Sequence, residues 1–366
     1  MTRTERATLA AAILGSAIVF LDGTIVSIAL KAIGEELPAT IVGKLEGQAY
    51  VSTGYLATLA ALLILAGALG DYYGRRRIFL IGLIGFGITS AACGLAPNLE
   101  MLVVARVLQG IAGALLVPGA LSIITSTFEG PARGRAFGIW ASATSGVTVL
   151  GPQLGGIIVQ LVSWRAAFLI NIPLVVAAAW LTTRYMRETR DDSATGHFDW
   201  LGAIVAAVGV GGLSFGITRE GQQQWQDPVG YWAIGLGIIG IIAFLVLMRV
   251  LREPLVPLSL FRIRSFATIN LSTLLIYGAL YSIFTFQALY LQGTLGYSPT
   301  AQALIGLPSG LMLTFLSARI GSIAGRIGAR AFLVAGPLVM AVGLLWWLRV
   351  PANSTPGWHR SRISGR

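Results

Sequence analysis

The chain has 366 residues, of which 55% are hydrophobic and only 11% are charged. Soluble domains carry roughly 25% charged residues, so this chain cannot cover a soluble surface and most of it must face lipid. The formal net charge of +11 does not indicate nucleic-acid binding, because the arginines lie in short loops between apolar runs rather than on one basic face.

Apolar runs of roughly 18 residues or more are long enough to cross a membrane as helices. Lipid offers no partners to the backbone, so the hydrogen bonds of these runs must be made within each segment. The sequence therefore predicts an all-α polytopic membrane protein with about eleven transmembrane helices. The predicted runs are residues 8–30, 48–70, 78–96, 100–124, 136–160, 165–183, 200–219, 230–250, 267–291, 301–321 and 331–349.

The arginines predict the orientation of these helices. Cytoplasmic loops carry an excess of Lys and Arg, and most loop arginines fall on the inner side when the N-terminus is cytoplasmic. The first apolar run is longer than the core of a secretory signal, so we expect an uncleaved first helix. We predict a multi-pass protein of the cell (plasma or inner) membrane.

Asp22 is a carboxylate deep inside the first apolar run, roughly 20 Å along a helix that rises 1.5 Å per residue. A charged acid at mid-membrane costs roughly 2.5–3.5 kcal/mol on insertion scales, so it needs a partner, water or a proton. We expect Asp22 to carry protons. The alternative is a polar residue close to the outer water interface.

A tight, charged turn joins the second and third runs. It reads Gly67-Ala-Leu-Gly-Asp71-Tyr-Tyr-Gly74-Arg75-Arg76-Arg77. Glycines let a chain reverse within a few residues and let two helix ends approach closely. The arginines place this turn on the cytoplasmic side.

Arg106 lies within the fourth run, in the stretch Arg106-Val-Leu-Gln109-Gly110-Ile-Ala-Gly113. It is the natural countercharge for Asp22, and Gln109 can donate and accept hydrogen bonds on the next turn. The alternative is an arginine that snorkels to the surface, because it lies only about a turn and a half inside the helix. We predict that Asp22, Arg106 and Gln109 form a proton-coupling site.

The fifth run contains Gly151-Pro152-Gln153-Leu154-Gly155-Gly156. A proline inside a helix removes a hydrogen bond and bends the helix. Glycines allow close packing against a neighbouring membrane helix. We predict a packing kink at Gly151, Pro152, Gly155 and Gly156.

Aromatic residues on the ninth run follow helical spacing. Tyr277, Tyr281 and Phe284 are spaced i, i+4, i+7, and Asn270 and Gln287 lie nearby. We expect this face to line a substrate cavity in which the rings hold lipophilic cations by cation–π contacts. The alternative is ordinary helix packing.

Little in the chain indicates catalysis or a cofactor. Cys93 is the sole cysteine, and neither His197 nor His359 has a Cys or His at metal-ligand spacing. The stretch Gly235-Leu-Gly237-Ile-Ile-Gly240 is a literal GxGxxG, but no strand precedes it, so we do not expect a nucleotide site. We predict a non-enzyme with no cofactor and no metal, driven by a proton gradient.

An internal repeat divides the chain. The stretch Gly321-Ser-Ile-Ala-Gly325-Arg326-Ile-Gly328-Ala-Arg330 repeats the charged turn, as parallel repeats do in transporters. The second repeat has three helices where the first has six, and the tail carries arginines on the outer side. We therefore expect a truncated or frameshifted C-terminus near residue 350. The predicted parts are a six-helix bundle at 1–190, two inserted helices at 191–265, a partial second bundle at 266–350 and an atypical tail at 351–366.

Several motifs, in this order, resemble those of the major facilitator superfamily. The inserted helices resemble its fourteen-helix branch of drug:proton antiporters, the multidrug efflux type. The resemblance covers residues 8–349. It is carried by the turn at 67–77, the stretches at 21–30, 106–113 and 151–156, and the shorter segments Trp164–Pro173, Phe198–Gly202 and Pro254–Phe261.

The resemblance implies a function. It implies a monomeric secondary transporter in the bilayer that exports small lipophilic or cationic molecules in exchange for protons. It also implies that Asp22 serves cation recognition and coupling, and that the segment at 151–156 marks an exporter. Finally, it implies gating by the 67–77 turn, with Asp71 as a latch. The gating residues are Gly67, Asp71, Gly74, Arg75 and Arg76.

Three alternatives stay open at this point. An exporter or importer of the same fold could act on one specific metabolite. An incomplete chain would insert into the membrane without transporting anything. A membrane enzyme is the third alternative, although no Ser/His, metal or paired-carboxylate group lies inside the apolar runs.

Overall fold

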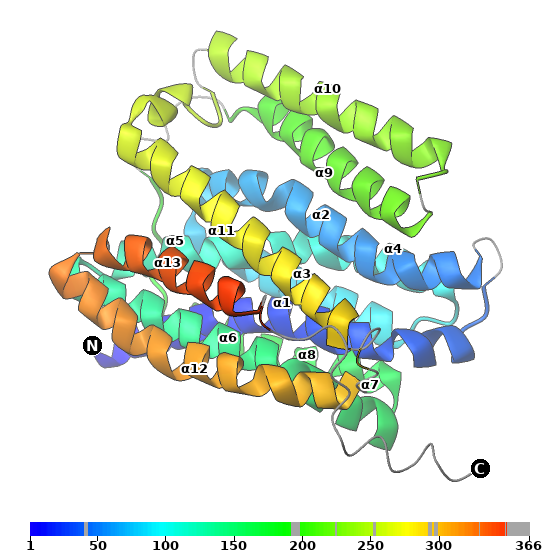
Figure 1. Ribbon diagram of the computed structural model, residues 1–366. Coiled ribbons are helices and arrows are strands. Elements are labelled where there is room, and N and C mark those ends of the chain that lie inside the picture. The colour runs from blue at the N-terminus through cyan, green and yellow to red at the C-terminus, as the bar shows by residue number, and fades with distance from the viewer. Residues whose placement is uncertain are drawn as a thin grey trace. The chain divides into compact units, whose positions relative to one another are not determined.

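The computed structural model describes residues 1–39, 43–191, 198–223, 225–251, 254–291, 295, 299–328, 330–347 and 349. The predicted tail at 351–366, including His359, lies outside these residues, as does His197. Throughout the described part every regular element is a helix, which confirms the predicted all-α class (Figure 1).

The helices form two compact units. One comprises Met1–Pro257 with Thr314–Ser322, and the other comprises Leu258–Leu313 with Ile323–Arg366. The predicted boundaries at residues 190 and 265 stay predictions. The helices of the first unit are α1 Arg3–Glu36, α2 Lys44–Tyr73, α3 Arg75–Gly94, α4 Leu99–Ala114, α5 Leu116–Thr127, α6 Gly130–Leu161, α7 Trp164–Leu169, α8 Asn171–Tyr185, α9 Trp200–Gln222 and α10 Pro228–Val250.

Two of the predicted runs are each split into two helices. The run 100–124 forms α4 and α5, and the run 165–183 forms α7 and α8, although each pair still makes one candidate membrane span. In both cases the first helix ends four residues before a proline, Pro118 or Pro173. A proline has no N–H to donate to the carbonyl four residues earlier, so the regular helix is interrupted there.

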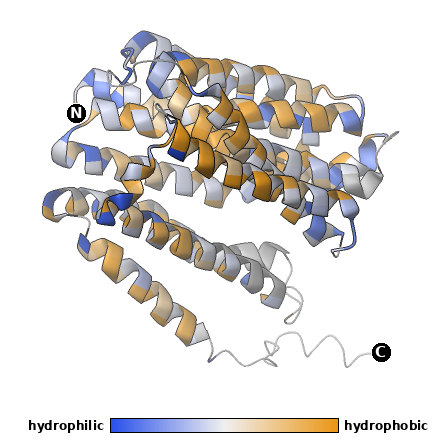
Figure 2. Cartoon of the chain, turned by 90° about the horizontal axis from the view of Figure 1, so that it is seen from above, coloured by the Kyte–Doolittle hydropathy of each residue, from blue (hydrophilic) through white to orange (hydrophobic). Residues whose placement is uncertain are grey.

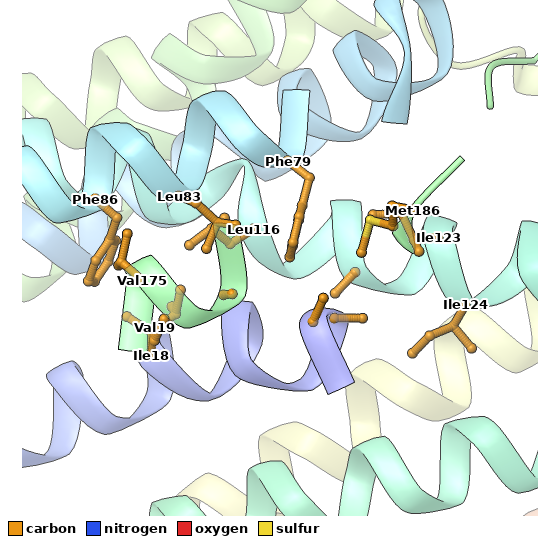
Figure 3. Packing of buried hydrophobic residues seen from close by; sticks show 14 of the residues in the cluster. Ile18, Val19, Phe79, Leu83, Phe86, Leu116, Ile123, Ile124, Val175 and Met186 are labelled. Atoms are coloured by element: carbon orange, nitrogen blue, oxygen red, sulfur yellow. The ribbon is translucent and has the colours of Figure 1, made fainter. Parts of the chain in front are cut away.

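The core of the first unit is built around α1, which packs against α5, α6 and α8. Phe79, Leu83 and Phe86 of α3 are fully buried and belong to one hydrophobic cluster with residues of α1, α5 and α8 (Figure 3). Other members of this cluster are Ile18, Val19, Leu116, Ile123, Ile124, Val175 and Met186. Because α1 lies among these helices, its central polar residues are held inside protein rather than lipid.

The hairpin of α9 and α10 is closed by glycines. A Cβ atom on Gly240 would lie 2.7 Å from Gly209 Cα, and one on Gly212 would lie 2.9 Å from the carbonyl oxygen of Ala233. Contacts this short leave room only for hydrogen on those Cα atoms. The GxGxxG stretch thus contributes to helix packing, and α9 in turn packs along α2.

The two ends of the first unit are each tied by long-range hydrogen bonds. At one end the backbone N–H of Arg75 donates to the carbonyl of Thr189 at 2.9 Å. At the other end the Leu99 N–H donates to the carbonyl of Pro38 at 3.0 Å, and Trp164 Nε1 donates to Glu36 Oε2 at 2.7 Å. The segments predicted to be cytoplasmic thus meet at one end, and those predicted to be outside meet at the other.

The remaining helices are the 3-10 helix η1 Leu258–Arg262, α11 Arg264–Leu289, α12 Pro299–Ile327 and α13 Arg330–Trp347. They belong to the second unit, except for the stretch Thr314–Ser322 of α12, which belongs to the first. Prolines lie inside the last two helices, at Pro308 and Pro337. The rings of Phe261 and Phe266 meet edge to face across the junction of η1 and α11, with centroids 5.3 Å apart.

Eight helical segments in the described part are long and apolar enough to cross a membrane. Figure 2 shows orange, hydrophobic residues along the helices. The predicted runs 136–160 and 267–291 form α6 and α11 but are not among the eight, and α13 is shorter. The chain is a multi-pass membrane protein.

Candidate functional site

Asp22 of α1 and Arg106 of α4 form a buried ion pair. Their side chains are 0% and 1% exposed, and Arg106 Nη1 donates to Asp22 Oδ2. Removing both charges from water is costly, so such a pair is held only where further hydrogen bonds satisfy the remaining atoms. The alternative that Arg106 snorkels to the surface is therefore wrong.

Backbone and aromatic groups of α2 hold the guanidinium of Arg106. Its Nε donates to the carbonyl of Val51 at 2.9 Å, and its Cζ lies 4.0 Å from the centre of the Tyr55 ring. A cation over an aromatic face is attracted by the ring quadrupole, more strongly when both are desolvated. The Tyr55 hydroxyl donates to the Val19 carbonyl of α1 at 3.2 Å, which fixes the ring.

Gln109 lies on the turn of α4 that follows Arg106, as predicted, and hydrogen-bonds both charged side chains. Its Oε1 accepts from Arg106 Nη1 at 2.7 Å, and its Nε2 donates to Asp22 Oδ1 at 3.1 Å. The same Nε2 donates to Ser90 Oγ of α3 at 2.8 Å. The structure thus brings the three predicted proton-coupling residues together.

Asn171 of α8 also contacts Asp22. It is the first residue of α8, at the break that precedes Pro173, and it is fully buried. Its Nδ2 donates to Asp22 Oδ1 at 2.9 Å and to Ser90 Oγ at 3.1 Å. Asn171 and Ser90 are not among the predicted site residues, and the only signal in the sequence is that both are uncharged polar residues inside apolar runs.

In the charged turn, glycine is required at Gly74. This residue ends α2 and precedes α3 with φ of +110°, a conformation that side-chain-bearing residues rarely adopt. Asp71 and Arg75 form an ion pair at 2.7 Å, in which Asp71 is 39% exposed. By contrast, a Cβ on Gly67 would make only an ordinary contact of 3.9 Å with Pro118.

Glu188, which follows α8, caps the first turn of α3 from across the sequence. Its two carboxylate oxygens accept from the backbone N–H groups of Arg76 at 3.0 Å and Arg77 at 3.1 Å. A helix N-terminus carries unpaired N–H groups and a positive dipole end, so a carboxylate is favoured there. Arg76 also reaches back, with Nη2 donating to the Thr183 carbonyl at 3.0 Å.

The glycines of α6 pack against α1 directly beside the buried pair. A Cβ on Gly151 would lie 2.9 Å from Thr24 Cβ, and a Cβ on Gly155 would lie 3.1 Å from Ile25 Cα. A Cβ on Gly156 would meet nothing within 4 Å. The predicted close packing therefore involves Gly151 and Gly155, with Pro152 inside the helix between them.

The predicted substrate face on α11 stays a prediction. Asn270 is exposed and donates to the Phe266 carbonyl of its own helix at 2.9 Å. Tyr277 is 56% exposed, and Gln287 is partly buried. The side chains of Tyr281 and Phe284 lie outside the described part.

Comparisons with known proteins agree with this architecture. The family model described as "Major Facilitator Superfamily" matches residues 12–361. The solved proton:xylose symporter XylE, bound to 6-bromo-6-deoxy-D-glucose, has the same fold, with a TM-score of 0.51 and 14% identity. That match covers 88% of this chain and 70% of XylE.

Two curated relatives are more similar in sequence. The multidrug resistance protein Stp of Mycobacterium tuberculosis (strain CDC 1551 / Oshkosh) is 34% identical over 94% of this chain. The tetracenomycin C resistance and export protein of Streptomyces glaucescens is 34% identical over 96% of this chain. The chain spans 64% of the length of each of these two relatives. With the family model matching nearly all of its helices, the chain belongs to the major facilitator superfamily of membrane transporters.

Proposed function

We propose that this protein exports small lipophilic or cationic molecules by alternating access, in exchange for protons. The observation that carries the proposal is the buried Asp22–Arg106 pair, whose side chains have almost no access to solvent. Ionisable residues inside membrane helices are costly, and they commonly mark proton or ion pathways. The two relatives named for drug resistance and export support the substrate class.

In the proposed cycle, Asp22 exchanges partners. When helix movement separates Asp22 from Arg106, the carboxylate takes a proton from the outer side. It releases the proton inside when Arg106 returns and the substrate has left. A proton crossing a potential of 100 mV supplies roughly 2.3 kcal/mol, and this gradient is the energy source in place of a cofactor.

The resemblance of residues 151–156 to the corresponding segment of exporters supports export as the direction. Gly151 and Gly155 bring the kinked helix against α1 at Thr24 and Ile25, next to the acid. A bend in α6 is therefore transmitted to the turn that carries Asp22. We further propose that the protein is a monomer in the cell membrane with its N-terminus inside, and its mass in detergent would test the first part.

The test is proton-driven uptake of ethidium by inverted membrane vesicles that contain the full chain. We expect Asp22→Asn to abolish uptake, because an amide cannot take up and release the proton. Glu35→Gln is the matched control, since Glu35 is 69% exposed and, among the described residues, pairs with the exposed Lys31 at 3.9 Å. Unchanged uptake by the Asp22 variant would refute coupling at this residue.

A further inference from the structure

Within the site, the two ends of the Asn171 amide are unequally satisfied. Its Nδ2 makes two hydrogen bonds, to Asp22 Oδ1 at 2.9 Å and to Ser90 Oγ at 3.1 Å. Its Oδ1 is buried and accepts no hydrogen bond from any described residue. A buried amide oxygen with no donor is unfavourable, and in a native structure such a group calls for an explanation.

We propose that Asn171 is a positioning residue. When Asp22 is protonated, the Asn171 amide rotates so that its oxygen and nitrogen exchange places. The inference rests on the proposed function, because it requires Asp22 to take up a proton. It goes beyond that function by naming the residue that stabilises the protonated acid and links it to α8.

The observed arrangement suits an ionised Asp22. A carboxylate only accepts hydrogen bonds, and here Oδ1 accepts from two amide nitrogens, those of Gln109 and Asn171, while Oδ2 faces Arg106. The Asn171 amide must then present its nitrogen, which leaves its oxygen without a donor.

Proton uptake reverses this requirement. A proton delivered from water on the outer side forms an O–H bond at Asp22 Oδ1, and Arg106 keeps its own protons. The new hydroxyl needs an acceptor, which Asn171 Oδ1 becomes once the amide has turned. Ser90 can follow, because a hydroxyl both accepts and donates. The amide then makes two hydrogen bonds through its oxygen, and its nitrogen takes the buried position in which the oxygen now lacks a partner among the described residues.

Gln109, the other amide of the site, cannot do the same. Its Oε1 accepts from Arg106 Nη1 at 2.7 Å and from Cys93 Sγ at 3.5 Å. Turning Gln109 would point its N–H groups at the guanidinium, which only donates. The unequal partners of the two amides therefore leave Asn171 as the one that can turn.

The other charged and titratable groups around the site leave the Asn171 amide to Asp22 and Ser90. In the described part, these groups are Arg106 on α4, Tyr55 on α2 and Cys93 on α3. Arg106 donates to Asp22, Gln109 and Val51, Tyr55 donates to Val19, and Cys93 donates to Gln109. Asn171 begins α8 at the break before Pro173, so the residue that turns lies where the helix of this membrane crossing is interrupted.

Infrared difference spectroscopy can test this directly. The full chain in lipid vesicles, with ¹³C in its aspartate carboxyls, is compared at neutral and acidic pH, and Asp22→Asn identifies the C=O band of protonated Asp22. In Asn171→Leu, which keeps the side-chain volume, we expect this band to move to higher frequency because the hydroxyl has lost its acceptor. Asn171→Ala should give the same shift if the leucine variant does not fold.

Asn270→Leu is the matched control for the infrared band, since in the described part Asn270 donates to the Phe266 carbonyl of its own helix, and it should leave the band in place. An unchanged frequency in both Asn171 variants would overturn the inference, and so would the absence of any band that depends on Asp22. If the band and its shift are present but Asp22→Asn exports ethidium normally, the proposed function fails while the role of Asn171 stands.

Discussion

At the residue scale, the site combines one full charge pair with neutral groups that can satisfy it in a dry environment. The guanidinium of Arg106 is shared among Asp22 Oδ2, Gln109 Oε1 and the Val51 carbonyl. Each of these acceptors comes from a different part of the first unit, so the pair depends on the relative positions of α1, α2 and α4. Such dependence is what a transporter needs if helix movement is to change the state of its acid.

Glu188 offers a prediction at the same scale. Removing a cap typically costs about 0.5–2 kcal/mol of stability, so Glu188→Ala should loosen the first turn of α3 without affecting the buried pair. We expect faster hydrogen exchange at the amides of Arg76 and Arg77, which donate to this carboxylate.

Glu129→Ala is the control for this experiment, because Glu129 also precedes a helix but makes no side-chain cap. Its substitution should leave exchange at the start of α6 unchanged. Equal exchange at Arg76 and Arg77 in wild type and Glu188→Ala would show that the turn is held by other contacts.

The charges of the site could be predicted from the sequence, and its neutral members could not. Asp22 and Arg106 stand out because ionised groups inside apolar runs demand a partner. Ser90 and Asn171 carry no charge, so they do not demand a countercharge and the sequence pattern does not set them apart. Glu188 was missed for another reason: its contact with α3 joins residues 112 positions apart.

At the element scale, the residues of each helix explain why most helix positions could be predicted and why two helix breaks could not. Lengths and positions follow from apolar runs, because lipid enforces helices. The breaks at Leu115 and Ile170 were overlooked since apolar residues continue through them, although Pro118 and Pro173 signal both. The break at Ile170 matters most, since it places Asn171 at the site.

The contact of α6 with α1 leads to a second prediction. In Gly151→Ala the added methyl group would overlap Thr24, including its Cβ at 2.9 Å, and turning the Thr24 side chain cannot relieve this. Overpacking of this kind costs typically about 1–3 kcal/mol. We expect a lower midpoint of thermal unfolding in detergent and weaker ethidium uptake.

Gly156→Ala, at a position five residues further along the same helix, provides the comparison. A Cβ there has open space around it, and alanine favours a helix over glycine by roughly 1 kcal/mol. This variant should unfold at the wild-type temperature or above. Equal losses in the two variants would point to a general sensitivity of α6 and not to its contact with α1.

At the scale of the whole molecule, hydrogen bonds gather the loops of the first unit at two ends, and the predicted orientation depends on which end is cytoplasmic. Arg75 and Thr189 meet at the arginine-rich end, and Pro38 and Leu99 meet at the other. Because positive loops stay inside, the end with Arg75 should face the cytoplasm.

Cysteine labelling tests this orientation. Val162 is 73% exposed in the loop between α6 and α7, and Glu129 lies in the loop between α5 and α6. On intact cells we expect a membrane-impermeant maleimide to label Val162→Cys and not Glu129→Cys. Wild type is the blank, because Cys93 is fully buried; labelling of the second variant alone would reverse the topology.

The charges of Asp22 and Arg106 cancel, and this has a consequence for how the molecule responds to membrane voltage. While both are charged, the site carries no net charge, so the membrane voltage exerts little net force on it. Once Asp22 is neutralised by a proton, the positive charge of Arg106 remains, and a potential that is negative inside pulls it inward with roughly 2.3 kcal/mol per 100 mV for a full crossing. The proton-loaded form is therefore expected to be the voltage-sensitive one.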